Sequence, residues 1–535
     1  MGLSQQIRRR SADAQQSLVQ LAMLGRLTRD LPRFLRKPID PEQAAVVVRR
    51  RLAARPERFL TLADRLIYRN PRSPYLRLLR AAGCERGDLQ TLVRHEGIEG
   101  ALHQLAERGV YVSFEEFKGH REIVRGSLRF APSDADFDHP FAAPHIERRT
   151  GGTRSQGTLV RMALSYVAEL APSIAVTLQA HGLSRADQAI WQTASLMQLL
   201  RFARVGLPPV AWFHPVQPLP SKVRAVATCL RLYGRVLGCS LPGPAWSDAQ
   251  SPHLMVAWLR DRVAAHGPIC LTCYASSAVR VCATALARGI SLSGVCFIVL
   301  GEPFTEAKRR VVEAAGAQVV VNYSAVEANT IAYGCAAPTA PDDLHLFTDS
   351  YAVIGLPRPV GGFGVEVDAF HLTSLLPSAP KVLLNVENGD YGTIARRDCT
   401  CFLGSLGLRD HLSYVRSHEK LTGEGMTFVK TRLVEVVEDV LPARFGGAST
   451  DYQVIEEETG DGLMRLSLLV SPGVGEVDPD DVRAAFLEEI GRGTELERYM
   501  ARFWELANTV QVERRPPRAT GVGKVLPFHL IRASR

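Results

Sequence analysis

The hydrophobic positions of the middle third of the chain alternate between helical spacing and short apolar runs. Val295–Leu300 and Val319–Asn322 are apolar runs that predict strands, and Thr305–Ala315 between them has helical spacing. The same patterns predict a short strand at Val210–His214 and helices over 159–182, 186–204, 221–237 and 252–265. Strand–helix–strand units of this size indicate a parallel sheet with crossover helices, and hence an α/β fold.

One apolar run ends in a polar turn that carries candidate chemistry. Val319–Val321 is β-branched and is followed by Tyr323 and Glu327. A run without alternation is typical of a strand buried on both faces, and ligands of open α/β sheets bind at the carboxyl ends of such strands. An aromatic ring can stack on a base there, and a carboxylate can hold a metal ion that bridges phosphate oxygens. A surface tyrosine and glutamate after an ordinary strand remain the alternative.

The pattern changes after residue 350. Strands are predicted at Gly364–Ala369 and Lys381–Val386, with turns at Asn388–Asp390 and Leu421–Gly425. A final α+β segment is predicted to contain helices at 429–440, 480–490 and 495–504, and strands at 451–456, 463–470 and 509–513. A chain of 535 residues exceeds the size of one compact core, so two or three domains are expected.

The positive charge is concentrated at the N-terminus. Residues 1–58 hold twelve arginines and one lysine against five acidic residues, which is +8 of the chain's net charge of +9. The main body is therefore nearly neutral, and no nucleic-acid groove is expected there. The basic segment itself fits a docked helical extension and an arm that touches an anionic partner or a membrane surface equally well.

Composition places the chain among soluble globular proteins. Hydrophobic residues make up 46% and charged residues 22%, and no apolar run reaches the roughly 18 residues of a membrane span. The ten cysteines, without a secretory signal, predict reduced thiols and a cytoplasmic location. Cys270 and Cys273 have redox-motif spacing, but their surroundings predict a strand-to-helix turn with buried thiols.

Four further segments carry candidate chemistry. The loop Thr150–Thr158 combines glycines and hydroxyls before a predicted helix, and its backbone N–H groups can surround phosphate oxygens. Gly301–Pro303 follows a strand, and Asp390 can accept hydrogen bonds from vicinal hydroxyls. Lys524 lies on a glycine-flanked loop near the C-terminus. Each segment alone is a weak signal.

In this order the segments resemble the adenylate-forming superfamily of acyl- and aryl-CoA ligases, and most of all its phenylacetate–CoA ligase-like branch. The resemblance runs from about residue 58 to the end and also includes Ile67–Tyr75, Phe114–Phe117, Gly301–Glu306 and Asp451–Val454. It implies a large adenylate-forming domain over 58–418 and a small mobile α+β domain over 419–535. The charge and helical spacing predict a basic helical extension over 1–57.

The resemblance also implies roles for individual residues. Glu327 would hold Mg²⁺, and Lys524 would contact the reacting carboxylate and the α-phosphate. The ATP-binding residues would be Gly152, Thr153 and Ser155 on the phosphate loop, Gly301, Glu302, Pro303 and Tyr323 around the adenine, Asp390 on the ribose, and Arg416 near the hinge. Residues beside the acyl group would be His214, Tyr274, Ala275 and Ser276, with a core-edge histidine as the alternative for His214.

The phosphate loop departs from the family pattern. Gln156 and Gly157 stand where a Lys-Pro pair is common, and Arg154 occupies a hydroxyl position. Val326 replaces the threonine that often precedes the glutamate. These changes remove phosphate contacts, so a slow or repurposed enzyme is an open alternative.

A cysteine and histidine set is a candidate metal site. Cys335 and His345 follow the Glu327 turn, and Cys399 and Cys401 follow the Asp390 turn. Three thiolates and one imidazole are a complete tetrahedral set for Zn²⁺. Members of the phenylacetate–CoA ligase-like branch look similar at these positions. The prediction is a structural zinc, and the alternative is four unrelated residues.

Together these observations predict an ATP-dependent ligase. It would convert a small-molecule carboxylic acid to an acyl- or aryl-adenylate and release pyrophosphate. The acyl group would then pass to coenzyme A, to a phosphopantetheinyl carrier protein or to an amine. ATP, Mg²⁺ and Zn²⁺ are the expected cofactors, and a possible homodimer is left open. The alternative is a catalytically degenerate adenylate-forming fold that serves as a binding or scaffold subunit.

Overall fold

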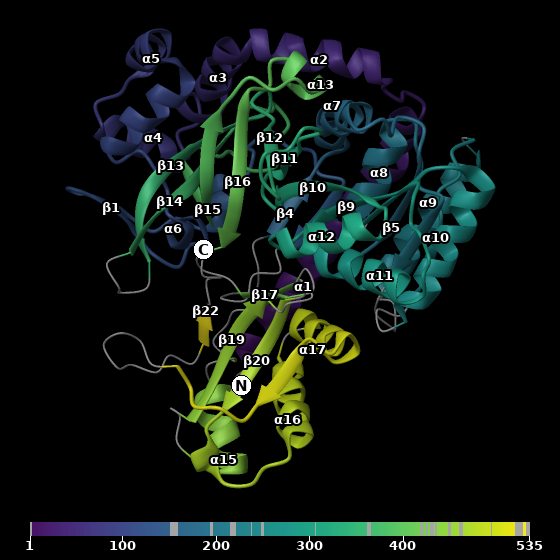
Figure 1. Cartoon of the computed structure of the whole chain (residues 1–535). Coiled ribbons are helices and arrows are strands. Elements are labelled where there is room, and N and C mark those ends of the chain that lie inside the picture. The colour runs from purple at the N-terminus through teal and green to yellow at the C-terminus, as the bar shows by residue number, and fades with distance from the viewer. Residues whose placement is uncertain are drawn as a thin grey trace.

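The structure is a computed structural model. It describes residues 3–149, 159–192, 196–214, 221–236, 238–247, 251–304, 306–360, 365–417, 421–423, 426–428, 433, 436–447, 451–458, 464–493, 495–518 and 528–530. Side chains of the first helix are described from Leu18 onward. Figure 1 shows a large upper part and a smaller lower part formed by the C-terminal segment.

A twelve-stranded sheet runs through the large part. Its strands in spatial order are β13 (Tyr351–Val360), β14 (Val365–Ser374), β15 (Val386–Arg396), β16 (Asp410–Ser417), β12 (Leu344–Leu346), β11 (Asn329–Gly334), β10 (Gln318–Ala325), β9 (Val295–Leu300), β8 (Ile269–Tyr274), β5 (Asp187–Trp191), β6 (Ala211–His214) and β7 (Pro244–Trp246). The strands from β10 to β7 pair in parallel, whereas those from β13 to β11 pair in antiparallel fashion with their neighbours. The predicted parallel sheet with crossover helices is therefore confirmed, and an antiparallel half continues it.

Helices connect and cover the parallel strands (Figure 1). They are α7 (Leu164–Ala180), α8 (Leu196–Arg204), α9 (Ser221–Val236), α10 (Pro252–His266), α11 (Ala275–Ala287) and α12 (Glu306–Ala314). All six residues of β8 are buried, as are the first five of β9. Coverage on both faces explains why these strands lack apolar/polar alternation.

Several predicted boundaries are wrong. The helix expected over 186–204 is strand β5 followed by α8, and residues 159–162 form β4 (Leu159–Met162), which pairs with β3 (Ile146–Arg149). A short apolar run such as Ala189–Trp191 fits a buried strand and a helix equally well by spacing. Cys270 and Cys273 lie inside β8 and not in a turn. The turn expected at Asn388–Asp390 lies within β15, where Gly389 has a φ of +84°.

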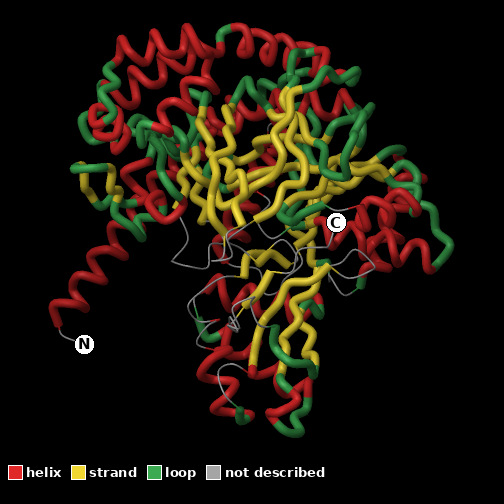
Figure 2. The backbone as a smooth tube through the Cα atoms, turned by 60° about the vertical axis from the view of Figure 1, so that its left-hand side comes forward, coloured by secondary structure: helices red, strands yellow, loops and turns green. Residues whose placement is uncertain are grey.

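The basic N-terminal segment is docked on the large part. It comprises α1 (Leu3–Leu35) and α2 (Pro41–Ala53), followed by α3 (Arg55–Ala63), a π-helix (Asp64–Tyr68), α4 (Pro74–Ala81), α5 (Arg86–Glu107) and the short α6 (Phe114–Phe117). Two hydrophobic core clusters include Leu31, Phe34 and Val48. The first turns of α1 extend away from the body (Figure 2).

Arginines of this segment hydrogen-bond backbone carbonyls of the body. Arg55 Nε donates to Thr348 O at 2.6 Å, and Arg58 donates to the carbonyls of Asp349 and Leu375 at 2.9 and 2.8 Å. Arg51 pairs with the buried Asp349 carboxylate at 3.4 Å. Part of the positive charge therefore holds the extension in place, as the docked interpretation expects.

The C-terminal segment has a core of its own. A four-stranded sheet has the order β21 (Val510–Glu513), β20 (Met464–Val470), β19 (Tyr452–Glu458) and β22 (Phe528–Leu530), with α16 (Pro479–Gly491) and α17 (Glu495–Ala507). Its core cluster contains Trp504 and Phe486, and from the large part it also includes Tyr274. Arg280 of α11 donates to Ala507 O at 3.2 Å. The two parts thus meet at the end of β8 and along α11.

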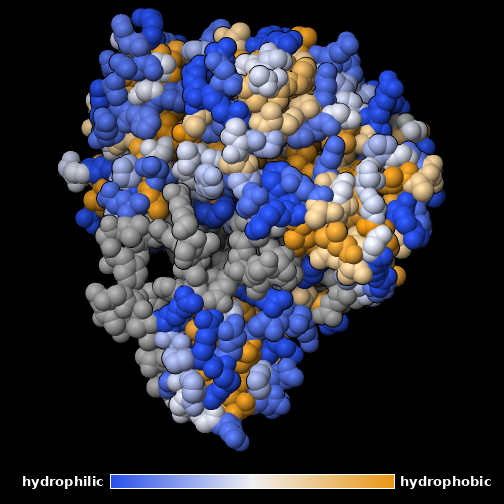
Figure 3. Space-filling view, in the orientation of Figure 1, coloured by the Kyte–Doolittle hydropathy of each residue, from blue (hydrophilic) through white to orange (hydrophobic). Residues whose placement is uncertain are grey.

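On the face shown in Figure 3, apolar side chains gather on the side of α9 to α11. Exposed large hydrophobic residues of these helices are Leu232, Val236, Leu254 and Leu286. Within the described ranges no helix is long and apolar enough to cross a membrane.

Candidate active site

The candidate site begins at the carboxyl ends of the parallel strands. Tyr274 of β8 stands opposite Leu300 of β9, and Val299 stands opposite Val321 of β10. This register places Tyr274, Gly301 and Tyr323 at one edge of the sheet. Gly301 has a φ of +84°, a backbone conformation that glycine adopts without strain. Three segments predicted as separate motifs therefore share one edge.

The loop after β9 is supported from within the protein. Lys308 of α12 has no exposed surface, and its Nζ donates to Pro303 O at 2.6 Å. Glu302 and Pro303 themselves are half-buried. A buried ammonium needs hydrogen-bond acceptors, so Lys308 holds this loop in one conformation.

Tyr323 and Asp390 are in direct contact. The Tyr323 hydroxyl donates to Asp390 Oδ2 at 3.0 Å, and Asn388 Nδ2 donates to the same hydroxyl at 2.6 Å. Burial and the neighbouring carboxylate raise the pKa of Tyr323 well above its usual value, so the phenol stays protonated and remains a donor. The predicted base-stacking ring and ribose carboxylate are therefore joined, across strands β10 and β15.

Glu327 lies on the turn between β10 and β11 and forms an ion pair with Lys118. The side chains of Lys118 and Glu327 are 9% and 15% exposed, so this pair is largely desolvated. Lys118 follows α6, whose N-terminus has a capping box between Ser113 and Glu116. Its Nζ also lies 5.1 Å from the centroid of the Phe114 ring. A segment 209 residues away in sequence thus supplies a cation at the predicted metal ligand.

The turn that carries Glu327 is fixed from the core side. Ala328 O accepts hydrogen bonds from the hydroxyls of Tyr166, at 2.6 Å, and Tyr351. Arg201 is 1% exposed and donates to Thr330 Oγ1 at 2.8 Å and Asn329 Oδ1 at 3.3 Å.

Among the described residues, the acceptors of the Arg201 guanidinium are all neutral, and they include the Tyr333 hydroxyl at 2.6 Å. Burying a cation that is held only by neutral acceptors costs folding free energy. Its hydrogen bonds fix Asn329, whose φ is +58°, directly after the Glu327 turn.

Arg416 is the penultimate residue of β16 and stands opposite Tyr391 of β15. Ser417 stands opposite Asp390, and its hydroxyl donates to Gly389 O at 3.2 Å. Arg416 Nη1 donates to Asp342 Oδ2 at 3.2 Å. Arg416 is therefore a near neighbour of Asp390 across strands β15 and β16. Its role in ATP binding stays a prediction.

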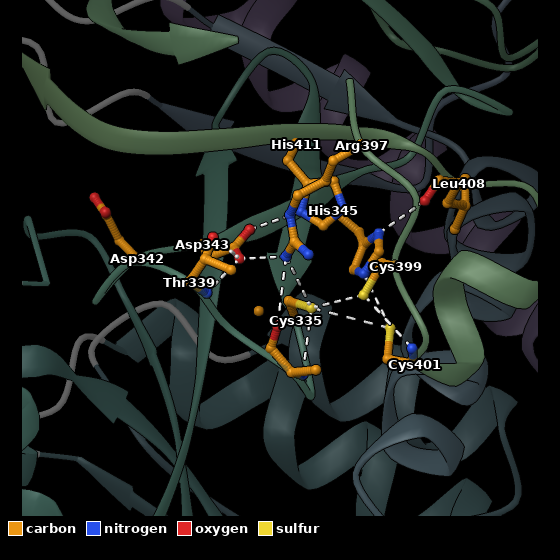
Figure 4. Close-up of polar contacts among 12 residues, drawn as sticks. Cys335, Thr339, Asp342, Asp343, His345, Arg397, Cys399, Cys401, Leu408 and His411 are labelled. Carbon is orange, nitrogen blue, oxygen red and sulfur yellow. Dashed lines mark hydrogen bonds and ion pairs between the residues drawn. The ribbon is translucent and has the colours of Figure 1, made fainter. Parts of the chain in front are cut away.

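The predicted metal ligands come together. Atoms of Cys335, His345, Cys399 and Cys401 that can bind a metal all lie within 4.8 Å of one another (Figure 4). Cys335 Sγ is 3.4 Å from Cys399 Sγ and 4.0 Å from Cys401 Sγ, and His345 Nε2 is 3.0 Å from Cys401 Sγ. Gly404 permits this packing, since a Cβ there would be 2.2 Å from Cys399 O.

Surrounding groups orient this cluster. His345 Nδ1 lies 2.8 Å from Leu408 O, an arrangement that places the ring proton on Nδ1 and leaves the lone pair of Nε2 facing the sulfurs. Backbone N–H groups of Ala337 and Cys401 point at Cys335 Sγ and Cys399 Sγ, at 3.3 and 3.5 Å. A hydrogen bond from the Cys335 thiol lowers the pKa of Cys401. The donor set and its orientation fit a tetrahedral zinc site.

Comparison with known proteins identifies the fold. No protein-family model and no curated protein matches the chain. A solved 2-hydroxyisobutyryl-CoA ligase, in complex with an adenylate and CoA, matches with 15% identity over 89% of each chain and a TM-score of 0.54. The chain therefore shares the fold of this ligase.

Weaker matches include a malonyl-CoA ligase, at 13% identity over 83% of this chain and 94% of that chain, with a TM-score of 0.42. An amide bond synthetase from Marinactinospora thermotolerans matches at 16% identity over 84% and 85%, with a TM-score of 0.40. The phenylacetate–CoA ligase-like branch and the predicted domain boundaries stay predictions.

Several residues that the sequence predicts for the site lie outside the described residues. They are Gly152, Thr153 and Ser155 of the phosphate loop, Lys524, and the side chain of Ser276. Of the predicted acyl-pocket residues, His214 is 1% exposed at the end of β6, and Ala275 is fully buried at the start of α11. Tyr274 packs in the core of the C-terminal part. Their contact with an acid stays a prediction.

The sequence did not single out Lys118, Arg201 or Asp342. Lys118 directly follows the Phe114–Phe117 segment that carries part of the resemblance. This position was the only feature of the sequence that could have indicated Lys118 as a site residue. Arg201 gave no signal, because a helix surface pattern does not reveal which arginine is buried. All three act on turns or strand ends far away in sequence.

Proposed function

We propose that the protein activates a carboxylic acid with ATP and transfers the acyl group to a thiol or an amine. In the first step a carboxylate oxygen of the acid attacks the α-phosphorus, and the bond to the bridging oxygen of pyrophosphate breaks. In the second step the acceptor attacks the acyl carbonyl carbon, AMP leaves, and the acceptor's proton is released. The observation that carries the proposal is the Tyr323–Asp390 contact at the end of β10, together with the Glu327–Lys118 pair on the turn that follows β10.

In this function the chain's residues bind and orient the nucleotide. Asp390 accepts hydrogen bonds from the ribose hydroxyls, and Tyr323, which is hydrogen-bonded to Asp390, offers its ring to the adenine. Lys118 orients the Glu327 carboxylate and adds positive charge where phosphate oxygens gather. Lys524 is assigned to the α-phosphate on the resemblance. Such fixed charges act by stabilising charge that grows in the transition state.

Glu327 would hold Mg²⁺. A single carboxylate at the rim of a largely desolvated site suits this ion, which binds through one or two carboxylates and completes its shell with water and phosphate oxygens. When bound, Mg²⁺ neutralises phosphate charge. We also infer that Cys335, His345, Cys399 and Cys401 bind a structural zinc that ties the loop after β11 to the loop before β16.

The first test is ATP–pyrophosphate exchange with wild-type protein and a panel of aryl, short-acyl, long-acyl and amino acids. Acid-dependent exchange with at least one class is expected, and Asp390→Ala serves as the control that lowers it. Coenzyme A, a carrier protein and amines are then compared as acceptors of the acid that is activated.

The departures in the phosphate loop favour a second candidate. Arg154, Gln156 and Gly157 remove phosphate contacts, so the chain would bind a nucleotide or an acyl compound without turnover. ATP binding by calorimetry without exchange for any acid would select this scaffold function. Absence of both binding and exchange would reject the nucleotide site itself.

A further inference from the structure

A buried aspartate outside the predicted site holds the strand end that carries Arg416. Asp342 is 3% exposed, and its oxygens accept hydrogen bonds from Tyr414 N at 2.8 Å, Val415 N at 2.9 Å and Arg416 Nη1 at 3.2 Å. These donors belong to three consecutive residues of β16. A carboxylate that accepts several N–H groups is well compensated for burial.

These hydrogen bonds coincide with a β-bulge. The pairing of β15 with β16 shifts register between Tyr391 and Thr393: Thr393 stands opposite Ser413, whereas Tyr391 stands opposite Arg416. Two residues of β16, Tyr414 and Val415, thus face the single Gly392. A Cβ at Gly392 would be 2.7 Å from Ser413 O, so the strands approach closely there.

The bulge needs an external acceptor. Tyr414 has a φ of +53°, a strained conformation for an aromatic residue. The extra residue of a bulge disrupts the ladder of interstrand hydrogen bonds, and Asp342 accepts from both amides of the bulge. A slip of one residue would exchange the faces of Arg416 and Ser417, because side chains of a strand alternate.

The residue next to Asp342 anchors the same loop to β16 and to Arg397. The adjacent Asp343 points the other way (Figure 4), with His411 Nδ1 2.6 Å from its Oδ1 and Arg397 in an ion pair with its Oδ2. His411 lies near the start of β16 and Tyr414 lies in its second half. Two neighbouring aspartates therefore hold β16 at two points from one loop.

We propose that Asp342 is a positioning residue for nucleotide binding. It fixes the Tyr414–Val415 bulge and the guanidinium of Arg416, and so sets the register in which Arg416 and Ser417 stand beside Tyr391 and Asp390. The inference rests on the proposed function, since it assigns Arg416 and Asp390 to the nucleotide.

The test uses full-length Asp342→Asn, with Asp349→Asn as the matched control. Asp349 is also a buried aspartate paired with an arginine, but its partner Arg51 belongs to α2 and not to β16. In Asp342→Asn an amide N–H₂ replaces one accepting oxygen and the charge opposite Arg416 is lost. We expect faster amide hydrogen exchange at Tyr414 and Val415 without nucleotide, and a KM for ATP raised about tenfold, with kcat changed less than threefold. Asp349→Asn should leave both quantities unchanged.

A double variant separates positioning from general destabilisation. If Asp342 acts through Arg416, then Asp342→Asn should raise KM little further in an Arg416→Met background. Additive effects, or hydrogen exchange at 413–417 equal to wild type, would overturn the inference. If wild-type protein binds no ATP, the proposed function fails, and hydrogen exchange alone then decides whether Asp342 holds the bulge.

Discussion

Lys118 and Glu327 form an ion pair between the end of α6 and the turn after β10. Loss of one partner leaves a charge in a largely desolvated place. Lys118→Met should therefore destabilise the protein, by up to about 3 kcal/mol in chemical unfolding, the lower end of the range for buried pairs because both groups keep some exposure. The double variant Lys118→Met with Glu327→Gln should recover part of this loss. Strictly additive effects would show that the pair contributes no coupling energy.

Arg201 should matter for turnover and not only for folding. Arg201→Met removes the donors to Asn329 and Thr330 and should release the turn that orients Glu327. We expect kcat in the exchange reaction to fall at least tenfold and the Mg²⁺ concentration for half-maximal activity to rise. Arg201→Lys keeps the positive charge but loses the several N–H donors of the guanidinium. Its kcat should lie between those of wild type and Arg201→Met. A variant with lower stability but unchanged Mg²⁺ dependence would limit Arg201 to a structural role.

Substitutions of Glu327 and Asp390 should affect different steady-state parameters. Glu327→Gln should lower kcat more than it raises the KM for ATP, because a metal ion neutralises charge that grows in the transition state. Asp390→Ala should mainly raise the KM for ATP, because the ribose hydroxyls are held equally before and during reaction. The measurement varies ATP at saturating acid. The reverse pattern would exchange the two roles.

The cysteine cluster should contain about one zinc per chain when protein purified without added metal is measured by elemental analysis. Cys399→Ser with Cys401→Ser should lower both the zinc content and Tm, because structural zinc contributes folding free energy. Cys229→Ser is the control, since Cys229 is a partly exposed thiol outside the cluster. A metal-free wild-type protein with full stability would refute the zinc site.

Lys524→Ala should nearly abolish adenylate formation while Tm stays close to wild type. The lysine is assigned to charge that develops on the α-phosphate, and loss of one such contact typically costs about 3–4 kcal/mol of transition-state stabilisation. Lys430→Ala, a lysine elsewhere in the C-terminal segment, is the control. Unchanged acid-dependent exchange in Lys524→Ala would remove this assignment.

The sequence by itself determined the parallel half of the sheet and the order of the site segments. Val319–Val321 and Val295–Leu300 read as buried strands because their residues are apolar on both faces, and the carboxyl ends of parallel strands meet at one edge. Tyr323 and Glu327 follow such a run, so the sequence placed them at this edge. Asp390 was assigned by the resemblance and lies within the antiparallel strand β15. The roles of all three in binding stay predictions. The cysteine and histidine set was also predictable, because few other reasons bring three thiols and an imidazole into that spacing.

The tertiary structure alone decided which distant residues complete the site. Lys118 meets Glu327 across 209 positions, and Arg201 meets Thr330 across 129. The spacing of residues along the chain predicts which side chains are neighbours within one helix or strand. It does not predict which charged side chain is buried against another element. The bulge in β16 could not be predicted from the sequence either, because its register depends on Gly392 of the neighbouring strand and on the carboxylate of Asp342. Local pattern thus located the sheet edge, whereas long-range packing selected the partners that hold its charged groups.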